Sequence, residues 1–314
     1  MCYERTDMAI ESSALFNKKT DEIQKLDGVE VIEEKHRDIH LTKVIITNED
    51  GEKSIGKPIG EYITIDLPGF VNLDDEFKTN IIKIISSNLK NILADKMNSG
   101  VFVVGLGNKK ITPDALGPKV VEGINVTRHL YDEATHLIDD TNTSACAISP
   151  GVLGITGIET AEIIKGIVDK IKPSVVICID ALATRSIHRL SSSVQISNTG
   201  ITPGAGVGNR RHTINESTLG VPVIAIGVPT VIDGATIVND SMSMLIEAIN
   251  NFSSEKSKGF IEKMDREHRY ALVSEILKPY ETSLIVTPKE VDLIIEETAM
   301  IISSAINYAL GNDI

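Results

Sequence analysis

The chain has 314 residues, 42% of them hydrophobic, and carries a formal net charge of −13 at pH 7. This apolar content is ample for a sizeable core, whereas the acidic balance argues against direct binding to nucleic acid or to an anionic membrane, since a basic face normally supplies that affinity. The three cysteines lack metal-ligand spacing, and no signal peptide or run of about 18 apolar residues is visible. We therefore expect a cytoplasmic protein.

The N-terminal third has the pattern of a small β-rich subregion followed by a long helix. Strand-like patterns cover residues 29–33, 39–47 and 62–67, with a turn signal at 49–51. Residues 73–97 instead carry apolar side chains at helical spacing. This part of the chain therefore predicts three strands and one helix that packs on a core.

From residue 101 onward, short apolar runs alternate with helical patterns. Strands are expected at 101–104, 145–148, 175–179, 194–197 and 223–226, and helices at 157–170, 232–250, 260–277 and 288–310. Alternation of this kind favours an α/β fold with a mostly parallel sheet flanked by helices.

Two aspartates follow strand-like runs in near-identical settings. Asp114 comes after residues 101–104 and a glycine-containing loop at 105–108, whereas the run 175–179 ends directly in Asp180, and each acid begins an Asp-Ala-Leu tripeptide. The carboxyl ends of parallel strands open into the crevice where ligands bind, so the two acids can face one another there. The alternative is that each aspartate only caps a following helix.

The motifs of other catalytic classes are missing from the sequence. There is no Gly-x-Ser-x-Gly nucleophile elbow and no His-Glu-x-x-His metal pair, and the loop at 105–108 does not continue to the third glycine of a dinucleotide fingerprint. Cys178 lies in an apolar run, which is a poor setting for an activated thiol. We expect no metal and no cofactor, and Asp114 and Asp180 are the best catalytic candidates by elimination.

Several longer motifs make the chain similar to a known family; they lie at residues 103–108, 112–119, 127–130, 150–160, 179–186 and 203–209. Together they resemble the germination protease (GPR endopeptidase) of spore-forming Firmicutes, and the resemblance runs from one end of the chain to the other. It implies an atypical aspartic peptidase that forms a homotetramer, has a fold similar to hydrogenase-maturation peptidases, and degrades small acid-soluble spore proteins in the spore core during germination. The family's two catalytic aspartates fall on Asp114 and Asp180.

Two carboxyl groups held close together can supply both an acid and a base. Because like charges a few ångströms apart cannot both ionise easily, the pair holds one proton. The ionised partner can take a proton from an attacking water, and the protonated partner can protonate the leaving amine. The sequence leaves open which aspartate plays which role.

The resemblance also implies a zymogen with a short propeptide. The segment from Asp7 and Met8 to Glu11 imitates the family's substrate pattern of an acid, a bulky apolar residue, alanine, a variable residue and glutamate. We expect residues 1–7 to be a propeptide that the chain removes itself in mild acid, by cutting between Asp7 and Met8, and residues 8–314 to form a single peptidase domain. The alternative is a frayed N-terminal tail.

Acidic substrates of this kind call for basic side chains at the site. The candidates are Arg185, Arg189, Arg210 and Arg211, although each could instead be structural. Two rival functions remain: a metal-dependent maturation peptidase of the hydrogenase-maturation type, in which the same acids would bind the metal, and a non-enzymatic α/β binding protein. The first generally needs a further His or Cys nearby, and the second would not explain a cleavable N-terminus.

Overall fold

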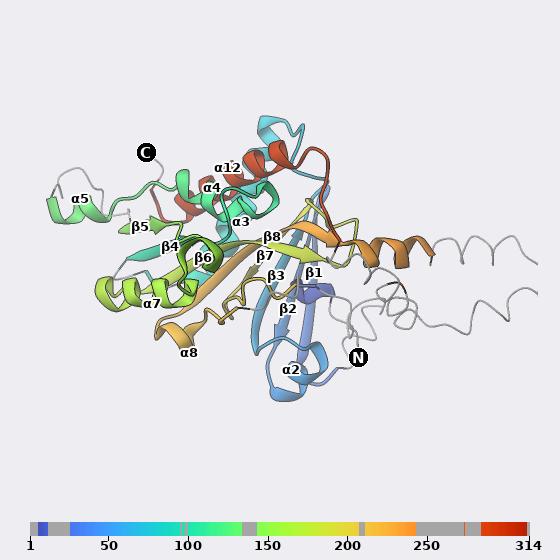
Figure 1. Cartoon of the computed structure of the whole chain (residues 1–314), viewed down its shortest axis with the longest axis horizontal. Coiled ribbons are helices and arrows are strands. Elements are labelled where there is room, and N and C mark those ends of the chain that lie inside the picture. The colour runs from blue at the N-terminus through green and yellow to red at the C-terminus, as the bar shows by residue number, and fades with distance from the viewer. Residues whose placement is uncertain are drawn as a thin grey trace, which may run out of the picture.

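The computed structural model describes residues 6–11, 26–94, 96–97, 100–133, 143–206, 211–242, 273 and 284–312. Within them, one sheet forms the centre of the molecule (Figure 1). Its strands are β1 (Val29–His36), β2 (Ile39–Ile46), β3 (Gly60–Asp66), β4 (Val101–Gly105), β5 (Ala145–Ile148), β6 (Val175–Thr184), β7 (Ser193–Ser197), β8 (Val223–Asp233) and β9 (Ile285–Val286). The principal helices are α2 (Glu49–Ile55), α3 (Asp75–Leu93), α4 (Leu116–Glu122), α5 (Arg128–Glu133), α6 (Leu153–Thr156), α7 (Thr160–Ile171), α8 (Glu216–Leu219) and α12 (Val291–Ala309).

The sheet has a parallel part and an antiparallel part. The strand order is β1-β2-β3-β7-β8-β6-β4-β5, with β9 pairing with β8. Strands β5, β4, β6 and β8 run parallel to one another, whereas β1, β2, β3, β7 and β8 pair antiparallel in succession. The predicted α/β class and the β-rich N-terminal subregion are both confirmed, and the β3–β7 ladder joins that subregion to the main sheet.

Alternating side chains of the parallel strands build two cores. On β4, Val101 and Val103 face a cluster that includes buried residues of α3, α4 and α12, while Phe102 and Val104 face a second cluster with α7 and α8. Strands covered on both faces are nearly continuously apolar, which is why these runs were readable in the sequence. Figure 1 shows α3, α4 and α12 on one side of the sheet and α7 and α8 on the other.

The helices predicted at 73–97, 157–170 and 288–310 are α3, α7 and α12, each of which begins two or three residues later than predicted. The helix predicted at 73–97 is α3, which begins after Asp74, whose carboxylate accepts a hydrogen bond from the Phe77 backbone N–H at 2.7 Å. The helix predicted at 232–250 starts two residues late because β8 continues to Asp233, and residues 234–242 are helical. The remainder of that helix, and all of the helix at 260–277 except residue 273, lie outside the described residues.

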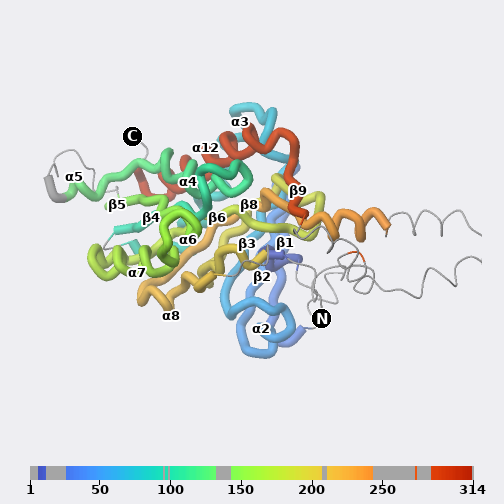
Figure 2. Tube along the Cα trace, in the orientation of Figure 1, coloured from blue at the N-terminus to red at the C-terminus, as the bar shows by residue number. Residues whose placement is uncertain are grey.

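The N-terminal segment 6–11 is packed into the fold. Its last three residues form a short 3-10 helix, η1 (Ala9–Glu11), and Ala9 joins an apolar cluster of β1, β2 and β3 that includes Val44 and Tyr62. Met8 and Ala9 are both 0% exposed. Figure 2 shows this dark blue segment against the strands of the N-terminal subregion. Residues 6–11 are therefore not a frayed tail.

None of the helices in the described ranges is long and apolar enough to cross a bilayer.

Candidate active site

The two candidate aspartates reach one cleft from different kinds of element. Asp114 ends a short 3-10 helix, η2 (Thr112–Asp114), which follows β4, and Asp180 lies within β6. The prediction that the strand ends at Ile179, just before the acid, is wrong. Strand β6 continues to Thr184 because its second half pairs in parallel with β8, as far as Thr184 opposite Ile232.

A glycine turn holds Asp114 in place. Gly107 has φ +107°, and a Cβ there would lie 2.1 Å from the backbone oxygen of Asp114, so a side chain would not fit. The next residue, Asn108, donates its backbone N–H to Asp114 Oδ2 at 2.8 Å. The loop at 105–108 therefore forms a tight turn that presents Asp114.

Helix capping accounts for neither aspartate. Helix α4, which follows Asp114, has no side-chain cap at its N-terminus. Asp180 lies inside a strand, and its Oδ1 accepts a bond from its neighbour Ala181 N at 2.9 Å. Neither acid therefore serves as a helix cap, which is the commonest role of an aspartate that follows a strand.

Burial changes the protonation of both groups. Desolvation raises the pKa of Asp114 from 3.8 to about 6, against the opposing hydrogen bond from Asn108. The pKa of Asp180 is raised well above its usual value, first by burial and then by the neighbouring charges of Asp114 and Asp7. Burial and the neighbouring carboxylates therefore both favour the protonated form of Asp180, and burial also favours that of Asp114.

The two acids line a cleft of 680 Å³ together with apolar side chains such as Leu106 and Val152. Asp7, from the N-terminal segment, lines the same cleft. Burial also raises the pKa of Asp7 above its usual value. Three carboxyl groups from distant parts of the chain thus meet in one partly apolar space.

The N-terminal segment is held along β6 beside Asp180. The Asp7 backbone N–H donates to the Ala183 carbonyl oxygen at 3.0 Å, and the Ala183 N–H donates to Asp7 Oδ2 at 2.9 Å. Gly206 packs against the same carboxylate, since a Cβ there would lie 2.1 Å from Asp7 Oδ2. These contacts position residue 7 in a fixed register next to the acids.

Glu11 occupies a buried polar site at the other end of the segment. Its carboxylate, 0% exposed, accepts bonds from Thr184 Oγ1 at 2.6 Å, from the Arg185 backbone N–H at 2.8 Å and from Thr6 Oγ1 at 2.6 Å. Arg189 Nη1 lies 3.6 Å from the carboxylate, and Arg185 Nη1 donates to the Glu11 carbonyl oxygen at 3.1 Å. A buried carboxylate needs partners of this kind, because an unpaired one costs several kcal/mol.

The four candidate arginines have different surroundings. Arg185 and Arg189 contact Glu11, and Arg189 also pairs with Asp66, Nε to Oδ1 at 3.2 Å. Arg211 lines the cleft and lies 3.9 Å from Glu159. Arg210 lies outside the described residues.

The sequence analysis missed two residues that contact the N-terminal segment from other parts of the chain. Lys57 Nζ donates to the Asp7 carbonyl oxygen at 2.9 Å, and Gln195 Oε1 accepts the Ala9 N–H at 2.7 Å. Neither residue belongs to a catalytic motif. Their contacts depend on the register in which residues 6–11 dock, and no local pattern encodes that register.

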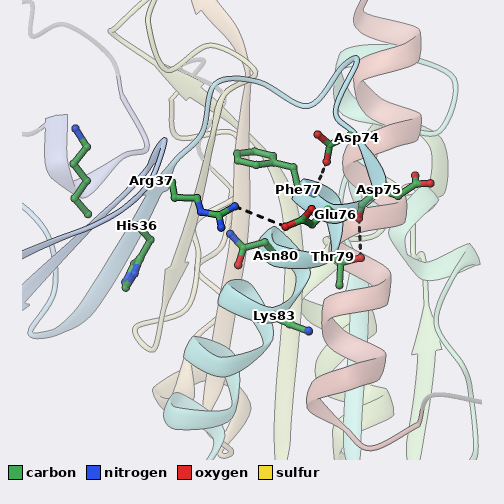
Figure 3. A pocket seen from close by; sticks show the side chains of 10 residues that line it. His36, Arg37, Asp74, Asp75, Glu76, Phe77, Thr79, Asn80 and Lys83 are labelled. Atoms are coloured by element: carbon green, nitrogen blue, oxygen red, sulfur yellow. Dashed lines mark hydrogen bonds and ion pairs between the residues drawn. The ribbon is translucent and has the colours of Figure 1, made fainter.

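A second hollow lies between the β1–β2 turn and the start of α3, and its lining side chains run from Lys35 to Lys83 (Figure 3). It measures 890 Å³ and holds an Arg37–Glu76 ion pair at 3.8 Å with both side chains exposed. Figure 3 shows the Arg37 side chain pointing toward that of Glu76. Within the described part of the chain, no three His, Cys, Asp or Glu side chains are grouped as a metal site would require.

Comparisons with known proteins agree on one family. The family model for germination protease matches residues 3–259 and 249–314. Germination proteases of Caldanaerobacter subterraneus subsp. tengcongensis and Clostridium tetani are 49% and 48% identical, each over 98% of this chain and over 94% and 95% of their own lengths. The one from Bacillus cereus is 38% identical over 99% of this chain and 94% of its own length.

Among solved structures, a NiFe hydrogenase maturation protease HycI from Thermococcus kodakarensis matches with 16% identity and a TM-score of 0.38. The match covers 72% of this chain and 99% of the HycI chain. The family model matches nearly the whole chain, and relatives of almost the same length are 38–49% identical to it, which establishes the family. The chain belongs to the germination protease family, and it is a peptidase.

Proposed function

We propose that this peptidase is an endopeptidase that starts the degradation of small acid-soluble spore proteins during germination, and that it is made as a zymogen which removes its own residues 1–7. The observation that carries the proposal is the docked N-terminal segment. Asp7 lies in the cleft of Asp114 and Asp180, and Glu11 is anchored four residues further along. A segment held in this way has the form of a bound substrate.

The Asp114 and Asp180 pair is proposed to activate the water. Because Asp180 is the more deeply buried acid and nearby carboxylates also raise its pKa, we assign Asp180 as the proton donor and Asp114 as the base. Asp114 would accept a proton from water as the water oxygen adds to the carbonyl carbon of the bond that is cut. Asp180 would donate a proton to the departing amine, so that the pair again holds one proton at the end.

Recognition of acidic substrates is proposed to use the site that holds Glu11. Thr184, Arg185 and Arg189 bind that carboxylate, and a spore protein with glutamate in the same position would place it there. Arg211 lies further along the cleft and could contact other acidic groups of the substrate, and Arg210 is proposed to do so as its neighbour. The supporting observation is that two of the four arginines surround a buried glutamate of the chain itself.

The wider organisation follows from the same proposal. Residues 1–7 would be the propeptide and residues 8–314 one peptidase domain, which assembles as a homotetramer and acts in the spore core. The ladder between β3 and β7 supports a single domain, because it joins the N-terminal strands to the sheet that carries Asp180.

Reading the N-terminus after incubation tests the self-cleavage. Purified full-length chain is held at several values between about pH 5 and pH 8, and its new N-terminus is sequenced, with the Asp114→Asn chain treated in parallel. A new N-terminus at Met8 in the wild type and none in the mutant is the expected result. An unchanged Met1 at every pH, or the same loss from the mutant, would refute it.

A strong chelator separates this proposal from a metal-dependent maturation peptidase. An aspartic pair needs no metal, so the rate should not change when the wild-type chain is treated. Loss of activity that returns when a divalent metal is added would assign the reaction to metal chemistry instead.

A further inference from the structure

The carbonyl group of Asp7 has its own set of donors. Lys57 Nζ donates to its oxygen at 2.9 Å, and Gln195 Nε2 lies 3.5 Å from the same atom. This carbonyl belongs to the bond between Asp7 and Met8. The peptide group that the chain is proposed to cut therefore has its carbonyl oxygen hydrogen-bonded to the positively charged Lys57.

Lys57 reaches this oxygen from the turn between α2 and β3. It is partly buried, and burial lowers the pKa of its ammonium group, while the carboxylates of Asp7 and Glu11 act in the opposite direction. If Lys57 served only to neutralise those acids, its ammonium should bond to a carboxylate. Instead, the Asp7 carboxylate is bonded by Ala183 and that of Glu11 by Thr184 and Arg185, and Lys57 bonds to the backbone oxygen.

Asp7 borders two different hollows. Asp7 lines the cleft that contains Asp114 and Asp180, and it also lines a neighbouring hollow that contains Lys57 and Gln195. A water activated by the acids can therefore approach from one hollow while the carbonyl oxygen is held from the other. Stabilisation of an oxyanion requires donors aimed at the oxygen on which the charge develops, and Lys57 and Gln195 lie at that oxygen.

The geometry points to Lys57 as a catalytic residue that stabilises the negative charge formed on the Asp7 carbonyl oxygen during cleavage. This inference rests on the proposed cut between Asp7 and Met8. As the water oxygen bonds to the Asp7 carbonyl carbon, the π electrons move to the carbonyl oxygen beside Lys57, and Asp114 takes the water's proton. When the double bond forms again, the C–N bond breaks and the Met8 nitrogen takes the proton of Asp180.

Gln195 keeps the carbonyl aimed at Lys57. Its Oε1 accepts the Ala9 N–H at 2.7 Å while its Nε2 lies near the Asp7 oxygen, so one side-chain amide brackets Met8 from both sides. Gln195 is itself buried on β7, which limits its rotation. It acts as a positioning residue, and the charge that stabilises the transition state comes from Lys57.

The test compares cleavage with docking in the full-length chain. Lys57→Met, Lys57→Arg and the control Lys53→Met, an exposed lysine on α2, are followed by the rate at which the Met8 N-terminus appears. Hydrogen exchange at the amides of residues 8–11 reports whether the segment remains docked. Removing one donor to such an oxyanion usually lowers the rate by a hundredfold or more.

We expect Lys57→Met to lose about a hundredfold in rate with the amides still protected, Lys57→Arg to recover part of that rate, and Lys53→Met to match the wild type. Unchanged cleavage by Lys57→Met would overturn the inference and leave the proposed function intact. Slow cleavage that accompanies loss of protection would make Lys57 an anchor and also overturn it. A wild-type chain that never cuts between Asp7 and Met8 would remove the proposed function and this inference together.

Discussion

The cleft of Asp114 and Asp180 differs in burial from the second hollow, between the β1–β2 turn and the start of α3, which we call the groove. Charged side chains line both. The groove is the larger, at 890 Å³ against 680 Å³. Its Arg37 and Glu76 side chains are 79% and 88% exposed, whereas Asp180 is 6% exposed. Water therefore screens the charges of the groove, and the protein environment determines the protonation of those in the cleft.

Burial, and not the volume of a hollow, therefore perturbs the protonation of the charged groups that line it. In the cleft, burial raises the pKa of both dyad acids, and the Glu11 carboxylate is paired at every oxygen. Perturbed carboxyl groups that converge in a concave site are typical of catalytic centres. Predictions that place large effects in the cleft and small ones in the groove test this comparison directly.

The largest effect is expected from the dyad itself. Asp114→Asn and Asp180→Asn should each reduce cleavage by a hundredfold or more, since each removes one half of the proton transfer. The measurement is the turnover of a peptide with the sequence of residues 3–14. Circular dichroism spectra that match the wild type show that the fold is retained. Near wild-type turnover by either variant would contradict the assignment of the dyad.

Substitution of Glu11 is expected to have a smaller effect, which slows self-cleavage but speeds the cleavage of an added peptide. Glu11→Gln removes a charge that lies near Arg189 and accepts hydrogen bonds from Thr184 and the Arg185 backbone N–H. Hydrogen bonds to charged groups contribute about 1.5 to 3 kcal/mol, or roughly 10- to 150-fold. Self-cleavage should slow by such a factor because the segment docks less well. Cleavage of an added peptide should rise, since the chain's own segment and the peptide compete for one cleft.

Glu33→Gln is the matched control, because Glu33 is an exposed glutamate on β1. Both rates should equal those of the wild type in that variant. If Glu11→Gln slowed self-cleavage and peptide cleavage alike, the Glu11 site would support the fold and would not bind substrate.

The sequence predicted that Asp114 and Asp180 lie in one cleft because burial of parallel strands leaves a local signal. The runs before Asp114 and Asp180 are apolar enough to identify as strands, and β5 was placed at its observed bounds, 145–148. The end of β6 was missed because Asp180 interrupts the apolar run and small residues follow it. Residues 181–184 are strand only because they pair with β8, about fifty residues further along the chain.

The rest of the site depends on contacts that no local pattern contains. Arg185 and Arg189 could be chosen as charges near the second acid, but their shared partner, Glu11, lies more than 170 residues earlier in the chain. Lys57 follows a helix-ending glycine, Gly56, and precedes a proline, so it looks like an ordinary exposed turn residue. Its contact with Asp7 exists only after the N-terminal segment has docked along β6.

An effect of a few kcal/mol is expected on stability, with a defined pH dependence. The pKa of Asp114 is raised from 3.8 to about 6, so the folded state binds its proton more tightly than the unfolded state. The penalty for burying its charge is therefore absent below about pH 4, grows as the pH rises to about 6, and is complete above that. Asp114→Asn lacks this penalty, and its amide oxygen can still accept the Asn108 N–H.

Chemical denaturation at about pH 8 and about pH 4 measures the difference. Asp114→Asn should be more stable than the wild type by roughly 1 to 3 kcal/mol at the higher pH, a range that allows for the partial exposure of the group. The two chains should be nearly equal at the lower pH. A variant less stable than the wild type at the higher pH would show that the carboxylate of Asp114 is favourably bound, contrary to its raised pKa.

The smallest effect is expected in the groove, from Glu76→Gln. The Arg37–Glu76 pair spans 3.8 Å between two largely exposed side chains, and exposed pairs of this kind contribute about 0 to 1 kcal/mol. Salt should weaken even that contribution, because both side chains are exposed to solvent ions. Self-cleavage and peptide turnover should therefore equal those of the wild type, since this groove and the cleft of Asp114 and Asp180 share no lining residue. A fall in turnover of tenfold or more would mean that the groove communicates with the dyad, and that burial alone does not separate the two hollows.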